Sequence, residues 1–214
     1  MCRLLYVNSK YEFDAKDYLL KFAEISKKSK EYQGHGWGCA YLQNNKWNFY
    51  KNIKPIWEDN LEQFGLTKRL IAHARSAFRD EGISVENNMP FYDDNYIFIF
   101  NGELRGVKIK EDGRIGAEKI FNYIKRFDKG NIKEAIKKGT EIIIKKSSYV
   151  RAMNFIIADK ENAYLYSFFN EDENYFTMHK KVTEDLILIC SDKFIDEDNW
   201  QPVPNNSFME FKCI

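Results

Sequence analysis

The chain has 214 residues, and its 33 basic residues nearly balance its 32 acidic ones, giving a formal net charge of +1. This balance gives no reason to expect nucleic acid or an anionic membrane as a partner. The N-terminus lacks the basic-then-apolar pattern of a secretory signal, and no apolar run approaches the roughly 18 residues of a membrane-spanning helix. We therefore expect a cytoplasmic protein with one domain over residues 1–214.

The first half of the chain predicts mostly strands. Apolar residues at helical spacing predict one helix over Lys16–Lys28, and Asn44–Asn45 separates two β-prone runs as a hairpin turn would. The strands predicted here are Cys2–Val7, Trp37–Leu42, Lys46–Tyr50, Arg69–Ala74 and Tyr96–Phe100. The last strand is uniformly apolar and ends at Asn101–Gly102, a turn pair, so we expect it to be buried on both faces.

The second half predicts two helices and then a meander of strands. The helices are Gly116–Phe127 and Ile132–Lys146, each with apolar residues at helical spacing. The strands are Met153–Ala158, Ala163–Phe169, Tyr175–Lys180, Leu186–Cys190 and Phe208–Phe211. This order favours an α+β fold with largely antiparallel sheets over a doubly wound βαβ fold.

The four cysteines, Cys2, Cys39, Cys190 and Cys213, are far apart and form no CxxC pair. We expect neither a zinc site nor a disulfide framework. Cys2 is distinctive because it follows Met1 directly. If Met1 is removed, Cys2 carries a nucleophilic thiol and a free α-amine with a pKa of about 7.7–8.0, which can serve as the base. Cys2 could equally pack as a small hydrophobe in the first strand.

Three other segments have unusual local sequences. In Gly34–Gly38, three glycines surround His35 and Trp37, which suits either a close backbone approach to a ligand or a plain turn. Small residues surround His73 and Arg75 in AHARSA; the Arg75 guanidinium could hold a carboxylate or a structural salt bridge, whereas His73 suits packing.

The third segment is FNGEL, in which Asn101 and Gly102 follow a rigid strand. Attack on an amide carbon places negative charge on the carbonyl oxygen. An Asn side-chain amide and a Gly N–H could donate hydrogen bonds to that oxygen. An isolated Asn–Gly pair more often forms only a turn.

Together these segments resemble the class II glutamine amidotransferase domain of the N-terminal-nucleophile (Ntn) hydrolases, and most closely its small stand-alone branch. The resemblance covers nearly the whole chain in the expected order. FNGEL departs from the family in having Phe100 where His is usual. The motifs that carry it are MCRLL, GHGWGCAY, AHARSA, ENNMPF (Glu86–Phe91), FNGEL and CSDKF (Cys190–Phe194) followed by Trp200 and Pro202.

The resemblance implies a four-layer αββα sandwich of two mainly antiparallel sheets. It implies that Cys2 attacks a side-chain amide, such as that of glutamine, through a thioester and releases ammonia, without metal or cofactor. Asn101 and Gly102 would form the oxyanion hole, and Arg75 would bind the substrate's α-carboxylate. We place His73, Trp37 and Gly36 in the same substrate-binding set. Transfer of the ammonia would need a separate acceptor-domain protein.

One departure leaves the substrate open. The family has an Asp that binds the substrate's α-ammonium at the start of the helix after the Asn–Gly motif, where this chain has Gly116. A lost charged contact of this kind could cost about 1.5–3 kcal/mol in binding. Glu118, Glu103 or Asp112 could substitute. Three alternatives therefore remain: glutamine, another amide such as a γ-glutamyl compound, or no catalysis in a binding protein that retains the fold.

Overall fold

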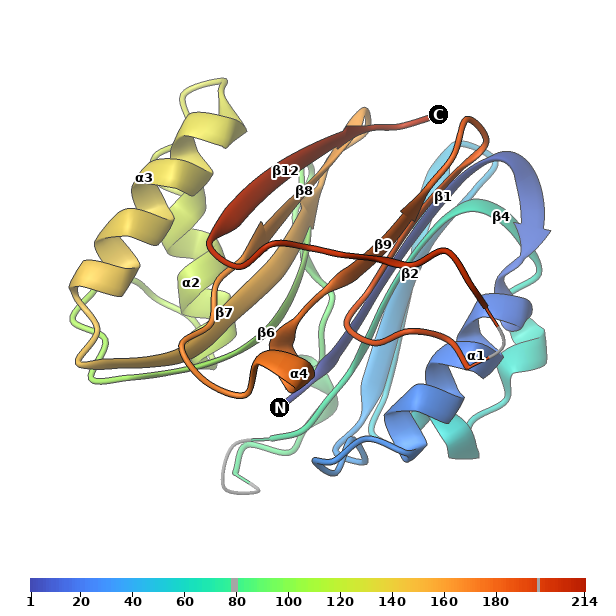
Figure 1. The fold of residues 1–214 in the computed structure, drawn as a ribbon, viewed down its shortest axis with the longest axis horizontal. Coiled ribbons are helices and arrows are strands. Elements are labelled where there is room, and N and C mark those ends of the chain that lie inside the picture. Colours follow the sequence, from blue (N-terminus) through green and yellow to red (C-terminus); the bar gives the residue numbers. More distant parts are fainter. Residues whose placement is uncertain (78–80, 196) are drawn as a thin grey trace.

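The structure is a computed structural model that describes residues 1–77, 81–195 and 197–214. The described strands form two antiparallel sheets (Figure 1). From edge to edge, the larger sheet contains β11 (Gln201–Pro202), β9 (His179–Val182), β10 (Leu186–Cys190), β1 (Arg3–Asp14), β4 (Leu66–Ala74), β2 (Trp37–Gln43) and β3 (Lys46–Asn52). The smaller contains β12 (Ser207–Lys212), β8 (Asn162–Ser167), β7 (Tyr149–Ala158), β6 (Ile97–Arg105) and β5 (Phe91–Tyr92).

The helices lie on the outer faces of the two sheets. Figure 1 shows α1 (Ala15–Lys27) beside the larger sheet, and α2 (Gly116–Lys125) and α3 (Ile132–Lys145) beside the smaller one. A single turn of helix, α4 (Glu173–Phe176), lies close to the N-terminus. Short 3₁₀ turns occupy Ile56–Glu58, Leu61–Gln63 and Val85–Asn87. This arrangement confirms the predicted α+β, four-layer fold. Within the described ranges, every helix is too short or too polar to span a bilayer.

The first part of strand β1, residues 3–9, is buried on both faces, which explains the apolar run Leu4–Val7. Leu5 and Val7 belong to the core that α1 covers, whereas Leu4 and Tyr6 belong to the core shared with the smaller sheet. Side chains alternate between the faces of a strand, so one short sequence serves both cores. β1 is thus fixed firmly, and its first residue is held at a defined place.

Local sequence accounts for two elements that were predicted well. The Asp14 side chain accepts a hydrogen bond from the Lys16 N–H at 3.0 Å and starts α1, which buries Leu19 and Phe22. Asn44 and Asn45 have φ angles of 50° and 59°, the left-handed conformations that a tight hairpin between β2 and β3 requires.

Two expectations were wrong. Asn101–Gly102 is not a turn, because β6 continues to Arg105 with Asn101 opposite Asn154 of β7. The strand predicted over Tyr175–Lys180 is instead the end of α4 followed by β9, so Tyr175 is helical. In both cases a neighbouring strand or a tertiary contact decides the conformation rather than local preference.

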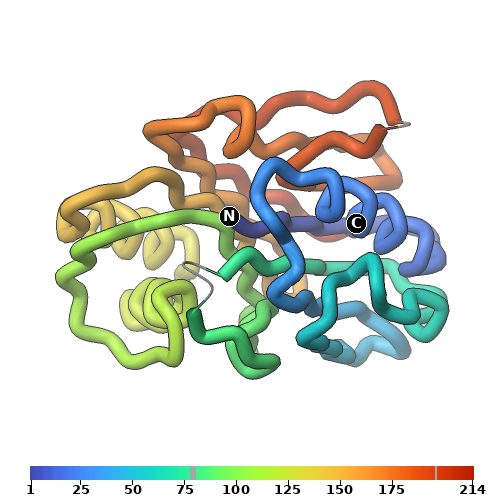
Figure 2. Tube along the Cα trace, turned by 90° about the horizontal axis from the view of Figure 1, so that it is seen from below, coloured from blue at the N-terminus to red at the C-terminus, as the bar shows by residue number. Residues whose placement is uncertain are grey.

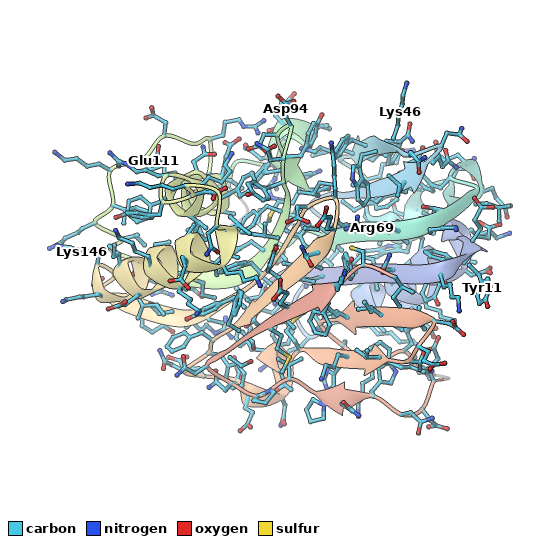
Figure 3. All side chains as sticks on the ribbon, turned by 90° about the horizontal axis from the view of Figure 1, so that it is seen from above. Tyr11, Lys46, Arg69, Asp94, Glu111 and Lys146 are labelled. Carbon is cyan, nitrogen blue, oxygen red and sulfur yellow. The ribbon has the colours of Figure 1, made fainter. Side chains whose placement is uncertain are left out.

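Arg69 of β4, labelled in Figure 3, lies opposite Asn8 of β1 and joins the two sheets. Its guanidinium donates to the carbonyl oxygens of Asp159 and Lys160, each at 2.8 Å, in the turn between β7 and β8. Arg69 is buried, and each charge-assisted bond of this kind contributes about 1.5–3 kcal/mol. Hydrogen bonds from this side chain to backbone carbonyl groups therefore link the larger sheet to the β7–β8 turn of the smaller one.

Candidate active site

Three strands of the larger sheet bring the predicted residues to one end of the sandwich. Arg3 of β1 lies opposite Ala74 of β4, and Ala74 also lies opposite Trp37 of β2. Cys2, Arg75 and Gly36 are the next residues beyond these pairs, so strand register alone makes them neighbours. Figure 2 shows the N-terminal residues in the middle of this end of the molecule.

Arg75 is held in place by its backbone and its side chain. Its N–H donates to the Gly36 carbonyl at 2.9 Å, and its own carbonyl accepts from the His35 N–H at 3.1 Å. The guanidinium donates to Asn88 Oδ1 at 3.3 Å and to the Gly82 carbonyl at 2.9 Å. A guanidinium has five N–H groups, so donors remain for a ligand.

Gly36 is required at its position for two reasons. Its φ is +103°, which side chains rarely adopt, and a Cβ there would meet the Asn88 amide and the Asn52 carbonyl. Asn88 is fully buried and donates to that same Asn52 carbonyl at 2.8 Å. Gly36 therefore makes room for the residue that orients Arg75. The ENNMPF motif contained Asn88, but nothing local in the sequence indicated this contact.

The Cys2 thiol is partly buried and lies 3.7 Å from the Ser76 carbonyl oxygen. Burial raises its pKa, and this effect outweighs the opposing influence of the Met1 ammonium and the Arg75 guanidinium. In the chain that retains Met1, the thiol therefore stays protonated at neutral pH. To become a nucleophile it needs a base nearby.

Asn101 and Gly102 lie on β6 of the smaller sheet, which contacts β1 and β4 across the interface. Asn101 is fully buried, yet neither its Oδ1 nor its Nδ2 has a hydrogen-bond partner among the described residues. Leaving such a group unpaired costs about 1–3 kcal/mol. A Cβ at Gly102 would collide with the Ala152 backbone, so the close approach of β7 requires glycine there.

His73 and Trp37 are both fully buried. The Trp37 indole packs in the core beside α1 and donates to Asp59 Oδ2 at 2.9 Å, so the structure gives it a packing role. Both ring nitrogens of His73 are buried. Burial lowers the pKa of His73 to about 3, with Arg75 acting in the same direction, so the ring is neutral.

The sequence did not predict the polar group that surrounds Met1. The Met1 carbonyl accepts hydrogen bonds from Gln33 Nε2 at 2.5 Å and from the Tyr175 hydroxyl at 2.7 Å. Its ammonium forms an ion pair with Glu31, which Arg151 also contacts at 3.1 Å. These residues are far apart in the sequence, so local patterns carried no sign of the cluster.

The other three cysteines lie in environments unlike that of Cys2. Cys39 and Cys190 are fully buried, and burial raises the pKa of Cys190 to about 12. Cys213 is partly buried and contacts the Tyr6 hydroxyl at 3.6 Å. Among the described residues, no cluster of three His, Cys, Asp or Glu side chains is arranged to hold a metal ion.

No protein-family model matches the chain, and no curated protein does. Solved structures do. The glutamine phosphoribosylpyrophosphate (PRPP) amidotransferase from B. subtilis, complexed with ADP and GMP, aligns with a TM-score of 0.64 and 17% identity over 89% of this chain. The match covers 42% of that protein, so this chain spans less than half its length.

Two shorter proteins match along nearly their whole length. A glutamine aminotransferase class-II domain protein from Silicibacter pomeroyi has a TM-score of 0.63 and 12% identity over 99% of this chain and 95% of its own. A predicted glutamine amidotransferase from Pseudomonas aeruginosa has a TM-score of 0.61 and 13% identity over 99% of this chain and 97% of its own. At these identities the comparison establishes architecture: the chain has the fold of the class II glutamine amidotransferase domain.

Proposed function

We propose that the protein, once Met1 is removed, is a cysteine amidohydrolase of the class II glutamine amidotransferase type. The α-amine of Cys2 takes the thiol proton, and the sulfur attacks the carbon of a side-chain amide. The C–N bond breaks as the α-ammonium gives that proton to the amide nitrogen, which leaves as ammonia, and a thioester remains. Water then attacks the thioester, releasing the acid and restoring the thiol.

The unpaired Asn101 amide is the observation that carries this proposal. Folding buries that amide without giving it a partner among the described residues. An oxyanion would supply the missing acceptor for Nδ2, and Gly102 would add its N–H. The substrate's carboxylate is assigned to Arg75, whose side chain is held beside Cys2 and whose charge acts on the thiol.

The first test is chemical. Intact mass shows whether Met1 is absent, and a glutamine-analogue electrophile such as a diazoketone should label Cys2. Ammonia release from glutamine should disappear in Cys2→Ala, while Cys213→Ser, a matched change at another partly buried cysteine, should retain it. Ammonia release that survives Cys2→Ala would defeat the mechanism. Retained Met1 together with an unlabelled Cys2 would favour a binding protein that keeps the fold.

A second candidate substrate is an amide that has a carboxylate but no free α-ammonium. Gly116 begins α2, and a Cβ built on it meets nothing within 4 Å, so no carboxylate of the described residues reaches that position. The charges nearby are mixed: Arg114 is paired with Glu118, and Lys51 adds a second cation. Lys51 and Arg114 lie within 5.3 and 5.4 Å of the Phe91 ring centre, and burial lowers the pKa of Lys51 to about 8, with Arg114 adding to the effect.

Because Glu118 already has a cationic partner in Arg114, the Lys51 charge disfavours an ammonium here and tolerates a blocked or anionic group. A panel of glutamine, glutaric acid monoamide, N-acetylglutamine and γ-glutamyl peptides separates the two substrates. The second candidate predicts that blocked amides have the higher kcat/KM and that Lys51→Met lowers their advantage. Efficient turnover of glutamine with no preference for the others would exclude it. Any transfer of the ammonia to an acceptor protein is a further part of the proposal, testable by adding candidate acceptor domains.

A further inference from the structure

The carbonyl group of Met1 lies in a site made by two buried side chains. Gln33 is fully buried and Tyr175 is 7% exposed, and both donate to the Met1 oxygen. Gln33 Nε2 and the Tyr175 hydroxyl also contact each other at 3.2 Å, and both contact Ser29 Oγ at 3.3 Å. This connected group converges on the peptide bond that joins Met1 to Cys2.

Cleavage of that peptide bond leaves the new α-amine close to the position that the Met1 carbonyl oxygen had occupied. Standard backbone dimensions put the carbonyl oxygen about 2.3 Å from the nitrogen to which its carbon is bonded. The nitrogen is that of Cys2, and it stays when Met1 leaves. The position to which Gln33 and Tyr175 point is then open to the freed amine with only a small shift.

We propose that Gln33 and Tyr175 position the α-amine of Cys2 and hold it in its neutral, proton-accepting form. The inference rests on the proposed function for its catalytic meaning. Tyr175 accepts a hydrogen bond from Gln33, so its own proton points to the vacated position and meets the lone pair of a neutral amine. Gln33 Oε1 is buried without a partner among the described residues, and turning the side-chain amide over would let it accept one amine hydrogen.

Some charged groups around the amine favour its ammonium form, and others favour its neutral form. Glu31 favours the ammonium, but its charge is shared with Arg151, which also pairs with Glu103 and Asp172. The Arg3 guanidinium lies 4.5 Å from the centre of the Tyr175 ring and opposes a second positive charge. Arg3 is itself paired with Asp192 at 3.1 Å. Arg75, the neutral His73 and the Cys2 thiol are further neighbours. Against these opposing charges, the hydrogen bond that the Tyr175 hydroxyl donates favours the neutral form of the amine.

The experiment measures the amine directly. In a Cys2→Ser background, where the thiol cannot react, competitive acetylation across pH followed by mass spectrometry of the N-terminal peptide gives the pKa of the α-amine. Tyr175→Phe and Gln33→Met are compared with Tyr149→Phe, which removes a hydroxyl that contacts Glu171 on the surface. Circular dichroism confirms folding, and intact mass confirms that Met1 is absent.

We expect Tyr175→Phe to raise the amine pKa by about 0.5–1 unit, the equivalent of one net hydrogen bond. The acid limb of kcat/KM should move upward by the same amount in the protein that retains Cys2. Glu31→Gln should lower the amine pKa, and Tyr149→Phe should leave it unchanged. An unchanged amine pKa in folded Tyr175→Phe overturns the inference. A shifted pKa in a protein that releases no ammonia instead supports the positioning role and rejects the proposed function.

Discussion

Replacing Asn101 with leucine should make the protein more stable and less active. Leucine has a similar size, and it removes a fully buried amide whose two polar atoms are unpaired among the described residues. Removing that penalty should stabilise the fold by about 1–3 kcal/mol. For a protein of this length, the gain corresponds to about 2–10 °C in Tm. Loss of an oxyanion donor should meanwhile lower kcat by about 10²–10³-fold.

Asn154 provides a matched control because it lies directly opposite Asn101 on β7. It is also fully buried, but its amide is satisfied: Nδ2 donates to the Phe176 carbonyl at 2.7 Å, and Oδ1 accepts from Ser167 Oγ and the Phe168 N–H, each at 3.1 Å. Asn154→Leu would leave those three groups unpaired. We expect it to destabilise the fold by about 2–5 kcal/mol.

Urea unfolding gives the free energies, and an ammonia assay on glutamine and blocked amides gives kcat. Asn101→Leu should therefore raise the free energy of unfolding, and Asn154→Leu should lower it. If Asn101→Leu destabilises the protein as much as Asn154→Leu, then the Asn101 amide is bound within the folded chain. The amide would then not be available to a ligand.

Three further predictions concern the same end of the sandwich. Arg75→Lys should raise KM for carboxylate-bearing amides by about 10-fold or more, since lysine cannot form the two-pronged bond; an unchanged KM would remove Arg75 from carboxylate binding. Gly102→Ala should destabilise the protein by about 1–3 kcal/mol because its Cβ meets the Ala152 backbone, as thermal melting can check. The third concerns His73, whose folded pKa of about 3 is below its unfolded value of 6.5. The stability from its neutral form is complete above pH 6.5 and falls by up to about 1.4 kcal/mol per pH unit below it. His73→Leu should flatten the urea-unfolding profile between pH 6.5 and 4, and an equally steep profile would contradict the assignment.

Elements with a strong local signal could be predicted from the sequence. The Asn44–Asn45 hairpin and α1 depend on turn chemistry, a helix cap and a regular apolar stripe. β6 was harder, because the preference of Asn101–Gly102 for a turn competes with pairing to β7, which local sequence does not reveal. Tyr175 was misassigned for the same kind of reason.

The site divides along similar lines. Cys2, Arg75 and Gly36 adjoin strand ends, and strand register gathers them. Gln33 and Tyr175 were missed because their contacts to Met1 span 32 and 174 positions of sequence. Such contacts arise only after both sheets have assembled.

The enclosure of Met1 bears on the timing of maturation. Its side chain is only 9% exposed and packs against the cluster of Ala152, Phe169, Tyr175 and Phe176. An aminopeptidase needs a free, extended N-terminus, so removal of Met1 competes with the folding step that buries Met1 and β1. We expect chains that fold first to persist as untrimmed, inactive molecules. Slower synthesis or added aminopeptidase should reduce that fraction in intact mass spectra, whereas adding the enzyme to folded protein should not.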